Sequence, residues 1–185
     1  ILEYQLGDPR DDYNDAIEIL QGLTASSFQF PKKHDAFFLL ATIYDELKQT
    51  NSAKKIWDQL AKQESNTIHK AKANLALGDY LFEQENPLEA IRYYNRALLI
   101  YDQLASDEAK YDRFKTYYRL LWANYKSAKL MEVVFAGEQT LENIYLETDL
   151  IARERIKQDT IDLIGRVIFE IDNLNQAKQI LSRDN

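Results

Sequence analysis

Residues 71–101, AKANLALGDYLFEQENPLEAIRYYNRALLIY, carry two apolar stripes at helical spacing with a short polar break between them. Each stripe contains a small residue, Gly78 on the first and Ala90 on the second. Two antiparallel helices cross at short range only where small side chains face each other. Asn86, followed at once by Pro87, is a typical start for the second helix. This stretch therefore predicts a tight helical hairpin.

The same arrangement recurs along the chain. The spacing of twelve residues between the two small residues occurs twice more, at Ala41 with Ala53 and at Gly165 with Ala177. The second-helix alanines are also 37 residues apart, at Ala16, Ala53 and Ala90. A fixed period of this length indicates stacked helical repeats. Between Gly78 and Gly165, a less regular unit fits the apolar pattern.

The apolar spacing predicts helices near 1–6, 12–25, 34–48, 51–64, 67–83, 87–106, 109–128, 131–145, 149–171 and 174–182. A possible capping box from Asn173 to Gln176 predicts the turn before the last of them. We expect an all-α fold, a right-handed superhelical solenoid of antiparallel helix pairs, in one domain over 1–185. Its approximate units are 1–25, 34–64, 67–106, 109–145 and 149–182. Because residue 1 is Ile within a repeat pattern, we expect a fragment of a longer chain.

The hairpin of residues 71–101 resembles a tetratricopeptide repeat, in which Leu77-Gly78, Leu81, Ala90, Tyr94 and Ala97 stand at the family's signature positions. The unit with Ala41, Tyr44, Ala53 and Trp57 is similar, as is the unit with Gly165, Ile168, Ala177 and Leu181. The resemblance implies a scaffold whose concave face binds peptides or helices of partner proteins. One subclass binds C-terminal carboxylates with a Lys, Asn and Arg clamp, but the matching positions here hold residues such as Phe38, Thr42 and Asp79.

Composition excludes several other functions. The chain has 30 acidic and 23 basic residues, a net charge of −7, and no cysteine. The acidic excess repels a phosphate backbone, so we expect no nucleic acid partner. The apolar runs are much shorter than the roughly 20 residues that a membrane span needs. Without cysteine the chain has no thiolate nucleophile or thiolate metal site.

If first helices line a groove, their inward positions become the candidate partner-binding residues. Those positions mix aromatic and acidic side chains, which suit a partner segment with apolar anchors and basic flanks. The alternative, which we favour for the aromatic residues, is that they pack against the adjacent repeat. The candidates are Phe38, Thr42, Asp45, Leu75, Asp79, Phe82, Arg119, Lys126, Asp162, Arg166 and Phe169.

The sequence offers no catalytic constellation, and we expect neither an enzyme nor a cofactor. His34 and His69 are 35 residues apart without further ligands at metal-binding spacing, so we expect no metal site. The alternatives to a free scaffold are the regulatory or substrate-recruiting arm of a larger enzyme and a structural part of a bacterial envelope assembly. An unprotected end unit also predicts homo-oligomers formed through the end units.

Overall fold

The computed structural model describes residues 9–25 and 32–183, with side chains from 13 to 25 and from 32 to 175. The helix predicted near 1–6 lies outside these residues. The described part is all-α and contains no strand. Its elements are α1 (Pro9–Ala25), α2 (Lys33–Glu46), α3 (Thr50–Ala61), α4 (Ile68–Glu83), α5 (Pro87–Tyr101), α6 (Asp107–Lys126), α7 (Leu130–Glu142), a short 3₁₀ helix η1 (Ile144–Leu146) and α8 (Leu150–Arg183).

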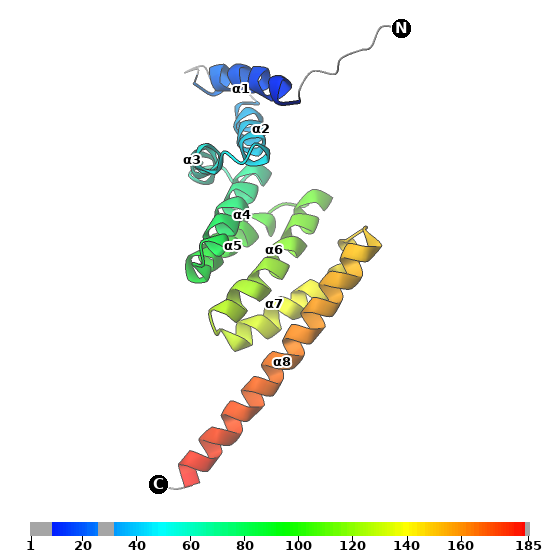
Figure 1. The fold of residues 1–185 in the computed structure, drawn as a ribbon. Helices are drawn as coiled ribbons and strands as arrows, with labels where there is room; N and C mark the ends of the chain where they lie inside the picture. The colour runs from blue at the N-terminus through cyan, green and yellow to red at the C-terminus, as the bar shows by residue number, and fades with distance from the viewer. Residues whose placement is uncertain (1–8, 26–31, 184–185) are drawn as a thin grey trace.

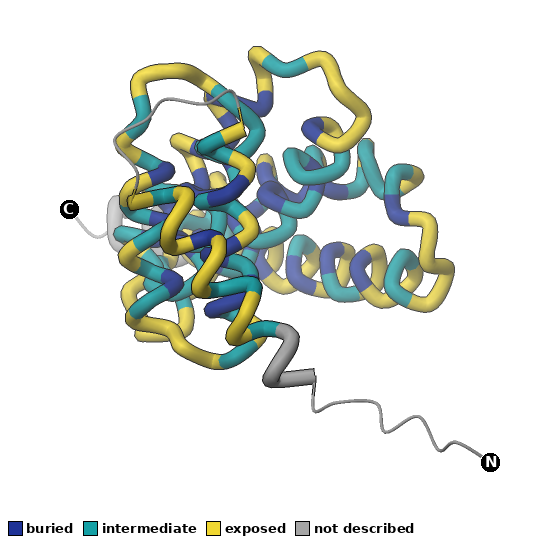
Figure 2. Tube along the Cα trace, turned by 90° about the horizontal axis from the view of Figure 1, so that it is seen from above, coloured by how far each residue is buried: buried dark blue, intermediate teal, exposed yellow. Residues whose placement is uncertain are grey.

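The helices form antiparallel pairs that stack one after another, as Figure 1 shows. The pairs are α2 with α3, α4 with α5, and α6 with α7, so the expected all-α solenoid is confirmed. Buried positions recur along successive helices and do not collect at a single centre (Figure 2). This distribution is typical of a repeat array, in which each unit is stabilised by its neighbours.

Small residues allow the close helix crossings that the sequence predicted. Ala41 and Ala53 have no exposed surface at all. A Cβ atom added to Gly78 would lie 2.5 Å from the Tyr94 ring, so only glycine fits beneath that ring on α4. Gly137 on α7 similarly accommodates Ile164 of α8. These contacts set the distance between paired and stacked helices.

The three hairpin turns share one backbone conformation. Lys48, Glu85 and Ala128 each have a positive φ, between 54° and 58°, although none is a glycine. In each turn the next amide donates to a carbonyl five residues earlier, as from Asn86 to Leu81 at 2.9 Å. This is the Schellman ending of a helix, and it reverses the chain within three residues.

Polar side chains start several helices. Thr67, Asn86 and Ser106 each accept a hydrogen bond from the backbone N–H three residues later. The cap at Asn86, with Pro87 at the first helical position, is the one predicted from the sequence. Such a cap stabilises a helix by about 1 kcal/mol.

The turn predicted at the end of the chain is wrong. Helix α8 runs without interruption over 34 residues, and the Asn173 to Gln176 box lies inside it. Gly165 and Ala177 therefore share one helix, about 18 Å apart along its axis, and do not face each other. The predicted unit 149–182 therefore contains a single long helix, α8, and not a helix pair, and α8 extends past α7 (Figure 1).

Candidate functional site

The first helices of successive pairs are joined by polar contacts, and several predicted groove residues form them. Asp45 on α2 accepts hydrogen bonds from Trp57 Nε1 at 2.7 Å and from the Tyr80 hydroxyl on α4. Asp79 on α4 accepts from Arg119 Nε on α6, at 2.7 and 2.9 Å to its two oxygens. Asp45, Asp79 and Arg119 therefore already have partners within the chain.

A second row of contacts joins the same helices nearer their starts. His69 Nε2 lies 2.7 Å from Asp35, and Lys72 forms an ion pair with Glu108 on α6. At the last junction, Lys115 and the Tyr111 hydroxyl both donate to Glu147 beside η1. The Lys115 hydrogen bond holds the pKa of Glu147 below its ordinary value. Charge is thus balanced locally along the wall of first helices.

The residues predicted near the start of the groove serve mainly for packing. The Phe38 ring meets Trp57 edge-on at 5.5 Å and stacks on His69 of the next unit at 4.7 Å. The Thr42 hydroxyl donates to the Phe38 carbonyl at 3.0 Å. Leu75 packs against two buried clusters. For Phe38, these contacts agree with the packing alternative that the sequence favoured.

Four of the predicted residues come together at one hollow between α4 and α6. Asp79, Phe82 and Arg119 line this cavity of about 260 Å³, and the Lys126 ammonium lies 4.6 Å from the Phe82 ring centre. The remaining lining residues, which the sequence analysis missed, are Glu83, Tyr94, Tyr118 and Trp122. We call this the α4–α6 hollow.

The floor and walls of the α4–α6 hollow are aromatic. Trp122 meets Tyr118 edge-on at 6.4 Å, and the Tyr118 hydroxyl donates to Asp159 of α8 at 3.0 Å. Tyr94 donates its hydroxyl to Asp79 at 2.8 Å, and burial, followed by the Asp79 charge, raises its pKa far above its ordinary value. Glu83 and Lys126 are exposed at the rim. The hollow thus combines an apolar interior with one acidic and one basic rim residue.

The three candidates on α8 do not line this hollow. Asp162 accepts a hydrogen bond from Gln158 at 2.9 Å on its own helix. Arg166 is exposed, and Phe169 keeps 70% of its surface exposed. All three are exposed on α8.

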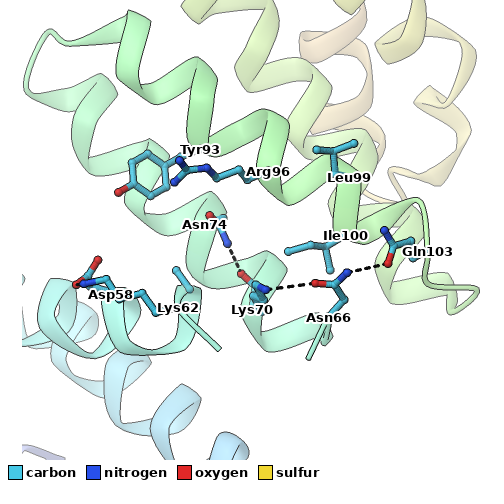
Figure 3. Close-up of a pocket in the computed structure, with 11 residues that line it drawn as sticks. Asp58, Lys62, Asn66, Lys70, Asn74, Tyr93, Arg96, Leu99, Ile100 and Gln103 are labelled. Carbon is cyan, nitrogen blue, oxygen red and sulfur yellow. Dashed lines mark hydrogen bonds and ion pairs between the residues drawn. The ribbon is translucent and has the colours of Figure 1, made fainter. Parts of the chain in front are cut away.

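A larger groove lies between α3 and α5, and the sequence analysis missed it. Two cavities of about 490 and 530 Å³ share Asp58 and Tyr93 as lining residues. Figure 3 shows Tyr93 and Arg96 on one side and Lys62 on the other, and the Arg96 guanidinium lies 5.1 Å from the Tyr93 ring. We call this the α3–α5 groove. Its signal in the sequence is the set of basic residues Lys54 and Lys55 on α3 and Lys62 directly after it.

In the part of the chain that the structure describes, no three side chains of His, Asp or Glu gather closely enough to hold a metal ion. None of its helices combines the length and the apolar character needed to cross a membrane.

Comparison with known proteins agrees with the repeat geometry. Two family models, both described as tetratricopeptide repeat, match residues 35–67 and 71–104. Among solved structures, BtubC (BKLC) from P. vanneervenii has a similar fold, with a TM-score of 0.68 and 17% identity, over 96% of this chain and 72% of that one. No curated protein matches the chain by sequence.

The matched ranges contain most of α2 with α3 and of α4 with α5, the pairs in which Ala41, Ala53 and Ala90 have no exposed surface. Repeats of this kind indicate a scaffold for protein–protein interaction. Residues 35–104 of the chain therefore contain two tetratricopeptide repeats.

Proposed function

We propose that the chain is a non-catalytic scaffold that binds an extended or helical segment of a partner protein along its first helices. The α4–α6 hollow is the centre of this surface. The observation that supports it is the aromatic interior formed by Phe82, Tyr118 and Trp122 on two consecutive first helices. Pockets lined by aromatic side chains can hold the anchoring side chain of a peptide.

The rim of the hollow defines the chemistry of the partner segment. Asp45 and Asp79 are bonded within the chain, so they do not attract a basic flank. Glu83 is exposed beside the hollow and is the acidic residue that a Lys or Arg of the partner meets. The partner segment therefore carries an aromatic or aliphatic anchor with a basic residue next to it.

The experiment is selection of binding peptides from a random display library with the full chain. We expect enriched peptides that pair an apolar anchor with Lys or Arg. Glu83→Lys should reduce their affinity by about tenfold, or about 1.4 kcal/mol, because a favourable contact becomes a repulsion. Selection with the Glu83→Lys chain should instead enrich peptides with Asp or Glu beside the anchor.

Glu138→Lys is the matched control, because Glu138 is an exposed residue of the second helix α7 and makes the same charge change. Far-UV circular dichroism of both variants checks that the fold is intact. Peptide binding that survives Glu83→Lys but is lost in Lys55→Glu would place the site in the α3–α5 groove and reject the α4–α6 hollow. A library that yields no specific peptide would reject peptide binding altogether.

A further inference from the structure

One position of the first helix differs in α4 from its counterparts in α2 and α6. Phe37, Asn74 and Tyr117 each stand eleven residues before the left-handed residue of their turn, so they occupy the same place in successive pairs. The Phe37 ring packs against the buried cluster that contains Leu40. The Tyr117 ring meets Phe135 of α7 edge-on at 6.3 Å. Helix α4 therefore carries an amide where both adjacent first helices carry an aromatic ring.

The missing ring coincides with the largest of three equivalent cavities. Phe37, Asn74 and Tyr117 each line a cavity beside their own helix. Its volume is about 360 Å³ at Phe37 and about 200 Å³ at Tyr117, but about 490 Å³ at Asn74. The second cavity of the α3–α5 groove, of about 530 Å³, shares two lining residues with the one at Asn74. The α3–α5 groove is thus enlarged where the adjacent pairs hold a ring.

Asn74 also brings a hydrogen-bond acceptor into this cavity. The residue is 2% exposed, and its amide nitrogen donates to the Lys70 carbonyl at 2.8 Å. Within the described part of the chain, no donor bonds its amide oxygen. Figure 3 shows the amide between Lys70 and Arg96, in the lining of the cavity. Because buried acceptors are normally bonded, we expect a ligand in the cavity to donate an N–H to this oxygen.

The lining of the α3–α5 groove carries positive charge that the chain does not neutralise. Its acidic residues already form ion pairs, Asp58 with Lys62 and Glu89 with Arg92. The basic lining residues that pair with no described carboxylate are Lys54, Lys55, Lys70 and Arg96. The chain as a whole has a net charge of −7, so the groove has the opposite sign to the chain. Such a surface attracts a ligand that supplies carboxylates.

We propose that the α3–α5 groove binds an acidic segment of a partner protein, with a large apolar side chain of that segment in the cavity beside Asn74. This side chain takes the place that the Phe37 ring takes in the preceding pair. A backbone N–H of the segment bonds the Asn74 oxygen, and its carboxylates meet Lys70 and Arg96. Nucleic acid fits less well, because the acidic remainder of the chain repels a phosphate backbone.

This second site does not depend on the proposed function, because it has other lining residues than the α4–α6 hollow and selects the opposite charge. The experiment starts from a peptide array probed with the full chain, in which a central Phe is flanked by Glu, Gln or Lys. We expect Glu-flanked peptides to bind the α3–α5 groove, Lys-flanked peptides to bind the α4–α6 hollow, and Gln-flanked peptides to bind weakly. The best Glu-flanked peptide is then labelled and titrated by fluorescence anisotropy.

Three changes test the position of the Glu-flanked peptide. Replacing its central Phe with Ala should weaken binding at least about tenfold, because the cavity then stays empty. Asn74→Phe places a ring in the cavity and should weaken binding by at least as much, whereas the Lys-flanked peptides should bind this variant as tightly as the original chain. Arg96→Glu reverses an exposed charge of the groove and should weaken binding about tenfold.

Arg155→Glu is the matched control for Arg96→Glu. Arg155 is exposed on α8 and, like Arg96, has no ion pair with a described carboxylate, so its replacement should leave the affinity of the Glu-flanked peptide nearly unchanged. Circular dichroism checks that all variants keep the fold. If Asn74→Phe disturbs the fold, Arg96→Glu at the exposed edge still tests the site.

Three results would overturn the proposal. Glu-flanked peptides that bind no more tightly than Gln-flanked ones exclude an acidic segment. Binding that is indifferent to both Asn74→Phe and Arg96→Glu takes place at another surface. Single-stranded DNA that competes as strongly as the peptide shows a general attraction of anions. Failure of the Lys-flanked peptides would instead count against the α4–α6 hollow, so the two proposals fail separately.

Discussion

Replacing Gly78 with Ala tests whether the close crossing of α4 and α5 holds the array together. The new methyl group would lie 2.5 and 2.6 Å from two ring carbons of Tyr94. That ring cannot easily move, since it is 1% exposed and its hydroxyl is bonded to Asp79 at 2.8 Å. Asp79 is in turn held by Arg119.

The expected loss of stability follows from two opposing effects. Overpacking of a buried site costs about 1–3 kcal/mol. Replacing glycine within a helix returns about 1 kcal/mol. Because the Tyr94 ring is held in place, the overpacking cost lies in the upper part of this range, about 2–3 kcal/mol, and we expect Gly78→Ala to lower the free energy of unfolding by about 1–2 kcal/mol. Gly165→Ala is the matched control, because no atom lies near the added methyl group, and it should raise the free energy by up to about 1 kcal/mol.

The assay is equilibrium unfolding in urea, followed by far-UV circular dichroism and by the fluorescence of Trp57 and Trp122. It is carried out at dilutions where the chain is monomeric, so that the Gly165 variant reports on the helix alone. A second check is the double variant Gly78→Ala with Tyr94→Leu. Its loss of unfolding free energy should be smaller than the sum of the losses of the two single variants, because the added methyl group no longer meets the Tyr94 ring. A Gly78→Ala chain as stable as the original would refute the close-crossing argument.

Two further predictions concern pH. Burial raises the pKa of Tyr94 and of Tyr101 in the folded chain, so above pH ~10 only the unfolded chain loses these protons. The free energy of unfolding should therefore fall by about 1.4 kcal/mol per pH unit for each tyrosine. Urea unfolding at several alkaline pH values measures this fall. The pKa of Glu147 is lowered in the folded chain, chiefly by its hydrogen bond from Lys115. The stability that ionised Glu147 contributes is therefore present above the pKa of the unfolded chain and is lost in acid. In the same assay, Glu147→Gln should destabilise the chain at neutral pH and have no such effect near pH ~3.

The sequence predicted the hairpins because close contact between two helices requires small residues at particular positions in the sequence. Ala41, Ala53 and Ala90 are fully buried, and an added Cβ at Gly78 would collide with the Tyr94 ring, so the spacing of these small residues in the sequence reflects the helix contacts. The turns themselves could not be predicted from glycine, because Lys48, Glu85 and Ala128 adopt the left-handed conformation that glycine usually takes at this position. Packing of the helices on both sides determines these turns.

The same reasoning explains the error at the end of α8. Asn173 and Gln176 are suitable for a cap, but no glycine or proline interrupts the helix there, and each residue accepts a helical conformation. A capping pattern permits a helix to begin without forcing the previous helix to end. Where no second helix packs back, the helix continues.

The candidate site was predicted only in part. Phe82, Arg119 and Lys126 meet because first helices lie side by side, which the period of the repeats implies. The pairing of Asp79 with Arg119 was not predictable, because it depends on the register between two units 40 residues apart. The α3–α5 groove depends on the gap between second helices, which side-chain spacing along one helix does not report.

The left-handed residues of the three turns limit how small an independently folding piece of this chain can be. Lys48, Glu85 and Ala128 each hold a conformation that costs an ordinary residue about 1 kcal/mol. A hairpin excised from the array keeps this cost but loses the adjoining helices that offset it. The minimal autonomous folding unit is therefore longer than one hairpin, and truncation should be planned between whole blocks of at least two pairs.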